Sequence, residues 1–382
     1  MRPARPHRHR VARLGTAAML ALLAAFAAPP AAGAVPHSPF PEYYGISPAT
    51  PLDASEADRI GASGAGTLRL PFYWPSIEPE APDPGGGGIE LPPLPGQLSD
   101  SKQWGETDAQ VEHAARAGLR VLPFVYGTPG WLSADPFRPP LDSEEARAAW
   151  RDLLGDLVRR YGPNGEFWAA NPGLPKTPVT AWQISNEPNS QMFWSPAPSP
   201  PEYAELLQIS AEAIRSADPS AAIVLAGMFG TPQSGVHAWD FLEGLYAVPG
   251  AAHAFDAYAL HPYAPNLRGL RAQVGLARKV VTANGDRSLP LLVTEIGWPT
   301  AGPEGYNLVK SPSAQRRLLT DAFKLFLEER RRWKVERVIW YTWRDNDVQP
   351  SCAVCRYSGL FTSDLEPKPA WGKFTQFAGG AP

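Results

Sequence analysis

Cysteine and histidine are scarce in this chain, and their scarcity limits the metal chemistry that we expect from it. Two of the 382 residues are cysteines, Cys352 and Cys355, and seven are histidines. A zinc site built on this C-x-x-C pair would need two more ligands, and no second such pair or histidine pair lies nearby. His237, His253 and His261 lack the spacing of a ligand set, and no H-E-x-x-H occurs. We therefore expect no metal and no organic cofactor, which argues against a metal-dependent hydrolase.

The chain also lacks an excess of positive charge. Lysine and arginine together number 35 against 38 aspartates and glutamates, for a formal net charge of −3. Five of the arginines come before residue 14, where no acidic residue accompanies them, so the remainder of the chain is more acidic still. Phosphate binding needs a basic face, so a nucleic acid is not an expected partner.

A membrane-spanning apolar run is a third absence. Leu14–Ala28 is apolar or small over about 15 residues, whereas a helix that crosses a bilayer needs roughly 20. This run follows the arginine-rich start and precedes Ala32-Gly33-Ala34, an order typical of a secretory signal peptide. We predict a signal peptide over residues 1–34, cleavage after Ala34, and a secreted protein with no membrane contact thereafter. An uncleaved membrane anchor is the alternative. In an exported chain Cys352 and Cys355 favour a local disulfide over a redox site.

Short apolar runs alternate with longer amphipathic stretches after residue 35. The runs are rich in Val, Ile, Leu and aromatic residues and are mostly bounded by Gly or Pro, which is typical of buried strands. They cover Tyr43–Ser47, Thr67–Tyr73, Arg120–Tyr126, Ala181–Asn186, Ala222–Gly227, Phe255–His261, Leu291–Thr294 and Arg337–Trp343. Helices with good start signals are predicted over Asp142–Tyr161, Pro201–Ala217 and Pro312–Trp333.

Repeated strand and helix units predict an α/β protein with a (β/α)8 TIM barrel, in a single domain over residues 35–382. A doubly wound sheet is the alternative, but no G-x-G-x-x-G follows the first strand. Residues with useful chemistry fall near or just past the carboxyl ends of different predicted strands. They are Arg69, Asn186, Glu187, His261, Tyr263, Glu295 and Trp343. Only a barrel brings all these ends to one face, which is where barrel enzymes carry their active sites.

Two of these residues are glutamates, and each follows a short apolar run. Glu187 lies in Trp-Gln-Ile-Ser-Asn-Glu-Pro-Asn, and Glu295 lies in Leu-Leu-Val-Thr-Glu-Ile-Gly-Trp-Pro. A carboxylate at the mouth of a buried strand is costly unless it has a use. Two of them are expected to act as a pair on a sugar bond. A structural ion pair with Arg69 is the alternative for these glutamates.

The order of motifs resembles the retaining glycoside hydrolases of clan A. Those enzymes are (β/α)8 barrels with an acid/base glutamate after strand four and a nucleophile after strand seven. Asn186-Glu187-Pro188, His261-Pro262-Tyr263, Glu295 and Trp343 match that pattern in order along the chain, and Arg69 matches an arginine on strand two. Gly359-Leu360-Phe361 and the Pro-Lys-Pro-Ala that follows are similar to family 39, with family 5 as the second choice.

The resemblance implies a secreted glycosidase that cleaves the β-O-glycosidic bonds of a polysaccharide or oligosaccharide by double displacement. It implies Glu187 as acid/base and Glu295 as nucleophile. Arg69 and Tyr263 would hold Glu295, and Asn186 would bind a sugar 2-hydroxyl. The alternative function is a carbohydrate-binding protein on a barrel that has lost turnover.

The remaining candidates have structural alternatives. His261 would orient a carboxylate or bind sugar, unless it is a buried and paired histidine. Trp343 would stack on a sugar ring, unless it packs in the core. Trp74, Trp131, Trp194 and Trp298 are further candidates for outer subsites. The loop Pro75–Ser101 is long and rich in Pro and Gly, and is either a surface insertion or a wall of the cleft.

Overall fold

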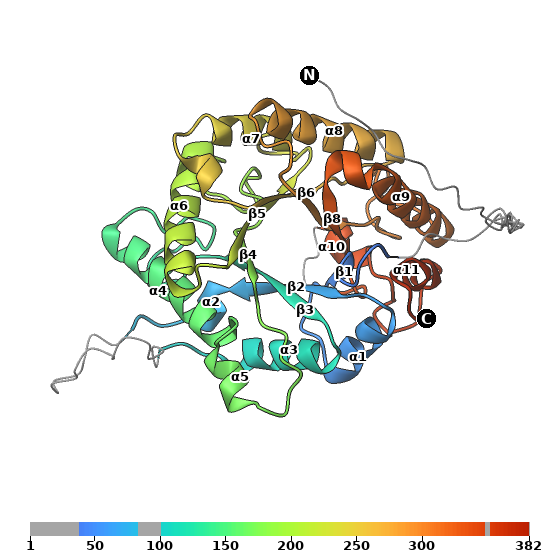
Figure 1. Ribbon diagram of the computed structural model, residues 1–382. Coiled ribbons are helices and arrows are strands. Elements are labelled where there is room, and N and C mark those ends of the chain that lie inside the picture. Colours follow the sequence, from blue (N-terminus) through green and yellow to red (C-terminus); the bar gives the residue numbers. More distant parts are fainter. Residues whose placement is uncertain (1–37, 83–100, 348–351, 382) are drawn as a thin grey trace, which may run out of the picture. The chain divides into compact units, whose positions relative to one another are not determined.

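The computed structural model describes residues 38–82, 101–347 and 352–381. Within these ranges, eight parallel strands pair in sequence order from β1 to β8, and β8 pairs with β1 to close a barrel (Figure 1). The strands are β1 Tyr44–Ser47, β2 Thr67–Tyr73, β3 Arg120–Tyr126, β4 Ala181–Ile184, β5 Ala222–Phe229, β6 Ala257–His261, β7 Leu291–Ile296 and β8 Val335–Tyr341. The predicted (β/α)8 barrel is confirmed. The predicted signal peptide and most of the predicted loop Pro75–Ser101 lie outside the described residues.

Helices surround the barrel and connect its strands (Figure 1). The longer ones are α1 Ala54–Ala62, α3 Gly105–Arg116, α4 Glu144–Tyr161, α6 Pro200–Ala217, α7 Ala238–Tyr246, α8 Leu267–Ala283 and α9 Pro312–Trp333. Short helices are α2 Trp74–Ile77, α5 Glu166–Ala170, η1 Ala251–His253, α10 Ala353–Tyr357 and α11 Trp371–Ala378. Among the described residues, none of these helices is both long enough and apolar enough to cross a bilayer.

Polar N-cap residues set where the long helices begin. The side chain of Ser143 accepts a hydrogen bond from the Ala146 N–H, so α4 starts just after it, two residues later than predicted. Ser199 and Ser311 cap α6 and α9 in the same way, and each is followed by proline, which fits the first helical turn. The serine caps and prolines therefore account for helix starts within two residues of those predicted.

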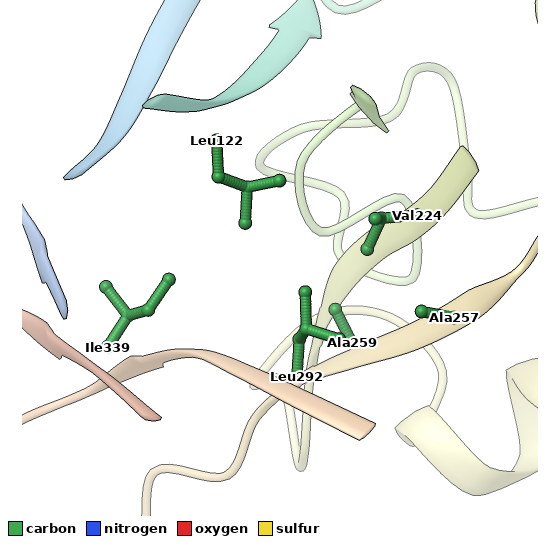
Figure 2. Packing of buried hydrophobic residues seen from close by; sticks show 6 residues of the cluster. All are labelled: Leu122, Val224, Ala257, Ala259, Leu292 and Ile339. Atoms are coloured by element: carbon green, nitrogen blue, oxygen red, sulfur yellow. The ribbon is translucent and has the colours of Figure 1, made fainter. Parts of the chain in front are cut away.

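Aliphatic side chains from several strands fill the interior of the barrel. They form a cluster of Leu122, Val224, Ala257, Ala259, Leu292 and Ile339, which point toward one another in Figure 2. Leu122 and Ile339 are fully buried. The barrel is therefore a packed core below its mouth, as the alternation of inward and outward residues along barrel strands requires.

Two strands end earlier than predicted at the mouth of the barrel. These earlier ends determine which side chains lie at the mouth. β4 ends at Ile184, so Asn186 and Glu187 lie in the loop that follows it. β8 ends at Tyr341, two residues earlier than predicted, which puts Tyr341 rather than Trp343 at the end of that strand. The predicted disulfide is present, because Cys352 and Cys355 are joined at the start of α10.

We predict that Leu122→Ala destabilises the fold by about 2–5 kcal/mol, because it removes a fully buried side chain from a packed cluster and leaves a cavity. The measurement is the guanidinium unfolding midpoint. Leu276→Ala is the matched control, since Leu276 on α8 is 41% exposed, and its midpoint should stay close to that of the wild type. Equal effects of the two substitutions would contradict the packing described for the barrel interior.

Candidate active site

A cavity of about 680 Å³ opens at the carboxyl ends of the strands. Every strand end contributes to its lining, as the barrel architecture leads one to expect. The lining side chains nearest the strand ends are Ser47, Pro71, Phe124, Tyr126, Asn186, Glu187, Phe229, Tyr263, Glu295 and Tyr341. Four of the residues singled out from the sequence therefore meet in one cavity, namely Asn186, Glu187, Tyr263 and Glu295.

Arg69 on β2 lies directly beneath this cavity and is fully buried. Its guanidinium donates to Glu295 Oε1 at 2.6 Å, to Asn186 Oδ1 at 2.8 Å and to Gln183 Oε1 at 2.7 Å. Its charged plane also lies 3.9 Å from the centroid of the Phe124 ring. The rigid, planar fork of donors on arginine suits such a multiply bonded buried site. Arg69 fixes the two acceptors in the mouth but does not itself line the cavity.

Both carboxyl oxygens of Glu295 are held. Arg69 donates to Oε1, and the Tyr263 hydroxyl donates to Oε2 at 2.9 Å. Tyr263 follows β6 and is itself supported by ring stacking on Phe229, with centroids 5.4 Å apart. Two charge-assisted donors favour the ionised form of the Glu295 carboxyl and fix its orientation toward the cavity.

Glu187 is positioned by an unusual backbone. Its φ of 43° lies in the left-handed region, which costs a non-glycine residue free energy and is found most often at functional sites. The Glu187 N–H donates to the Gly227 carbonyl at 3.2 Å, which holds the turn against β5. His261 Nδ1 hydrogen-bonds Glu187 Oε1 at 2.7 Å. One carboxyl oxygen is thus engaged by His261, and Oε2 is left for a bound molecule.

His261 is fully buried and does not line the cavity. Its Nε2 lies 3.0 Å from the Thr294 hydroxyl, so both ring nitrogens are engaged within the protein. Gly227 makes room for this ring, because a Cβ there would lie 1.9 Å from His261 Nε2. His261 is therefore placed to orient Glu187, and the alternative role of sugar binding is not available to it.

The two glutamates are close together. One carboxyl oxygen of Glu187 and one of Glu295 lie within 4.8 Å of each other, and His261 Nδ1 is within the same distance of both. Retaining glycosidases separate their carboxyl groups by roughly 5–5.5 Å, and inverting enzymes by roughly 6.5–9.5 Å to admit a water molecule. The bound on the nearest oxygens of Glu187 and Glu295 lies below both of these ranges.

Burial sets the protonation of this pair. Burial raises the pKa of Glu187 well above its ordinary value, and the neighbouring Glu295 raises it further. Burial also raises the pKa of Glu295, but the Arg69 charge and the hydrogen bond from Tyr263 oppose that rise. Burial and Arg69 lower the pKa of His261 well below its usual range, so its ring is neutral. The surroundings therefore favour the charge on Glu295 and the proton on Glu187.

Glu187, His261 and Glu295 could in principle bind a cation, since their ligand atoms lie close together. The hydrogen bonds argue for proton chemistry instead. Arg69 places a fixed positive charge against Glu295, which repels a cation at that position. His261 and Tyr263 also hydrogen-bond one oxygen of Glu187 and one of Glu295, which leaves fewer lone pairs for a metal.

Asn186 is oriented by Arg69. Because its Oδ1 accepts from Arg69, its amide nitrogen is turned away and can donate into the cavity that Asn186 lines. This orientation suits the predicted contact with a sugar hydroxyl, which stays a prediction.

The tryptophans proposed as sugar platforms lie elsewhere. Trp343 is 1% exposed, its Nε1 donates to Glu56, and its ring packs between Phe361 and Trp371. The predicted stacking face of Trp343 is therefore covered, and that expectation is corrected. Trp74, Trp194 and Trp298 are also buried, and Trp131 donates to the Glu78 carbonyl; none of the four lines the cavity.

Of the three tyrosines that line the cavity and were not selected from the sequence, two end strands and the third is Tyr306. Tyr126 ends β3 and Tyr341 ends β8. Burial raises the pKa of Tyr126 to about 12, so its hydroxyl stays protonated. Both tyrosines end predicted strands or lie close to a predicted strand end. Their position at the mouth was therefore readable from the same pattern that identified Arg69 and Glu295.

Solved structures with the same fold include several glycosidases. A family 39 glycoside hydrolase from Bacteroides cellulosilyticus aligns over 88% of this chain with 20% identity and a TM-score of 0.58. A family 39 β-xylosidase from Caulobacter crescentus aligns over 89% of this chain and 72% of its own, with 19% identity and a TM-score of 0.61. An endo-β-1,4-glucanase from Xanthomonas axonopodis aligns over 89% of this chain and its whole length, with 14% identity and a TM-score of 0.55.

These similarities show the barrel fold that the chain shares with the glycosidases. The chain spans 63% of the Bacteroides structure, so that protein has substantial length beyond the shared barrel. No protein-family model matches the sequence. No curated protein matches it either.

We predict that Glu187→Gln stabilises the protein at neutral pH and leaves it unchanged near pH 4. Above the ordinary pKa of 4.5, the unfolded chain ionises Glu187 while the folded protein keeps the proton, so the wild type loses stability as the pH rises. Glutamine does not ionise and avoids this loss. Melting temperatures between pH 4 and pH 8 test the prediction. Glu243→Gln on α7 is the exposed control and should follow the wild type throughout. A constant difference between Glu187→Gln and wild type at every pH would contradict a raised pKa.

Proposed function

We propose that this protein hydrolyses O-glycosidic bonds, with retention of configuration at the anomeric carbon. The observation that carries the proposal is the buried pair Glu187 and Glu295, whose nearest carboxyl oxygens lie within 4.8 Å and whose surroundings differ. One carboxyl keeps a proton and the other is held by a guanidinium. That division of roles is what double displacement at a sugar requires.

In the first step, Glu295 acts as nucleophile and attacks the anomeric carbon. Protonated Glu187 gives its proton to the glycosidic oxygen, the bond from that oxygen to the anomeric carbon breaks, and the leaving group departs as an alcohol. A covalent glycosyl ester on Glu295 remains. Arg69 and Tyr263 hold the attacking carboxylate in place through their hydrogen bonds to its two oxygens.

In the second step, Glu187 has lost its proton and serves as a general base. It takes a proton from a water molecule, whose oxygen attacks the anomeric carbon and releases Glu295. The Glu295 charge is neutralised while the ester exists, which removes the electrostatic contribution that raised the pKa of Glu187. Formation of the ester on Glu295 therefore favours the ionised form of Glu187, which is the form that acts as a base in the second step.

The structural neighbours support a β-glycosidase. Besides the β-xylosidase and the endo-β-1,4-glucanase, they include an exo-β-1,4-mannosidase from an Opitutaceae bacterium. We propose a β-linked sugar substrate on this basis. We also propose export from the cell, which rests on the basic and apolar start of the sequence and on the disulfide between Cys352 and Cys355.

We predict that Glu295→Ala abolishes hydrolysis of every substrate. Glu187→Gln should lose roughly 10²–10⁴-fold in kcat on alkyl glycosides, which need protonation of the leaving oxygen. The same variant should lose far less on 2,4-dinitrophenyl glycosides, whose leaving group departs without a proton. The assay uses a panel of aryl β-glycosides and dyed polysaccharides.

Glu243→Gln on the exposed face of α7 is the control for this experiment and should retain full activity. Near-normal turnover by Glu295→Ala would show that the nucleophile assignment is wrong. If no substrate is cleaved by the wild type, but one carbohydrate binds equally to the wild type and to Glu295→Ala, the protein is a carbohydrate-binding protein.

A further inference from the structure

The cavity carries very little charge beyond its two glutamates. Among the described residues that line it, Glu187 and Glu295 are the only ionisable acids, and no lysine, arginine or histidine joins them. A uronic acid or a sulfated sugar would need a cationic partner in such an enclosed site. No tryptophan lines the cavity within this part of the chain either. The described lining therefore disfavours an anionic sugar, and a neutral one needs no charged partner here.

The side of the cavity next to Glu187 is where a leaving group would lie, because Glu187 protonates the leaving oxygen. This side is made by the segments that follow β4 and β5. Asn189, two residues after Glu187, joins them, since its amide donates to the Phe229 and Val236 carbonyls at 2.7 Å each. Asn189 is fully buried, so the two segments form one continuous surface with the acid.

Four apolar side chains lie on this surface, beside the polar residues Ser190, Gln191, Gln233 and Ser234. We refer to Met192, Phe193, Phe229 and Pro232 as the aglycone wall; all four line the cavity. Met192 is 57% exposed, the highest exposure of a large hydrophobic side chain among the described residues. Phe193 is half-buried and held edge-on by Phe137 with ring centroids 5.5 Å apart. A flexible thioether beside fixed rings is an adaptable apolar surface.

Three of the polar residues on the same side hydrogen-bond within the segments after β4 and β5, while a fourth, Gln233, also lines the cavity and is exposed. The Ser234 hydroxyl donates to Gln191 Oε1, and the Gln191 N–H donates to the Ser234 carbonyl. Ser190 Oγ accepts from the Met192 N–H at 3.3 Å. Fewer donors and acceptors are therefore left to bind the hydroxyl groups of a second sugar, which a polysaccharide would place here.

Resting on the proposed function, we propose that the natural substrate is a neutral glycoside whose leaving group is apolar, an alkyl or aryl alcohol, and that the aglycone wall binds that group. A cavity of about 680 Å³ is of the size that encloses one small ligand, and suits a single sugar with such an aglycone. The wall supplies affinity by burying apolar surface beside the acid that protonates the departing oxygen.

The test measures kcat/KM for the methyl, butyl and octyl β-glycosides of the sugar whose aryl β-glycoside the protein cleaves best. These alcohols have similar acidity, so differences report binding of the chain rather than leaving-group chemistry. A fully covered methylene contributes roughly fourfold. We expect kcat/KM to rise at least tenfold from methyl to octyl, and to exceed the value for the corresponding disaccharide.

Two variants locate the effect. Met192→Ser should lower the octyl-to-methyl ratio several-fold, because it removes apolar surface from the wall. Leu276→Ser changes an exposed leucine on α8 outside the cavity and should leave the ratio as in the wild type. Since Met192 is exposed, its replacement should not impair folding, and a melting curve confirms this.

The outcomes separate this proposal from the proposed function. If the protein cleaves aryl glycosides but does not prefer octyl over methyl glycosides, the apolar aglycone is wrong and the proposed glycosidase activity stands. The same holds if the protein prefers longer oligosaccharides. An octyl preference that Met192→Ser does not reduce also overturns the role of the wall. Failure to cleave any aryl glycoside overturns the proposed function and this inference with it.

Discussion

The site depends on one buried positive charge. Arg69 is fully buried at the barrel mouth, where an uncompensated guanidinium would cost several kcal/mol. Its compensation comes from three acceptors on two strands and their ends: Glu295 on β7, Gln183 on β4 and Asn186 just beyond β4. Satisfying this single charge therefore fixes the relative positions of β2, β4 and β7. The nucleophile candidate and the amide beside the acid candidate are held by the same group.

Arg69 also breaks the symmetry between the two glutamates. Both are buried and both have a raised pKa for that reason, so burial alone would not distinguish them. Arg69 touches Glu295 and not Glu187, while Glu187 faces a histidine that burial keeps neutral. The same buried space thus holds one carboxyl whose raised pKa is opposed by Arg69 and Tyr263 and one whose pKa is raised further by its neighbour. The acid and nucleophile roles that we propose rest on which carboxyl the guanidinium reaches.

The grouping of the site residues could be predicted from the sequence, because strand ends in a barrel converge independently of the loop conformations. β2 and β3 have the predicted bounds, and Arg69, Asn186, Glu187 and Glu295 lie together as the order of strands requires. Trp343 was misplaced because β8 ends two residues earlier than its apolar run, and the chain then turns into the core. The aglycone wall was not predictable, because loop conformation depends on long-range contacts such as those of Asn189 rather than on local pattern.

The division between strands and loops has a consequence for specificity. The strand ends supply charged and hydrogen-bonding side chains. Most of these side chains bond to one another inside the protein, so few substitutions are compatible with their positions. The loops after β4 and β5 supply apolar surface and are attached to the acid through Asn189. Substitutions in the wall can therefore change which leaving group is bound while Glu187 keeps its place. Because Glu187 and the wall share one buried anchor, the proposed leaving group would bring its oxygen to Glu187 when it packs against the wall.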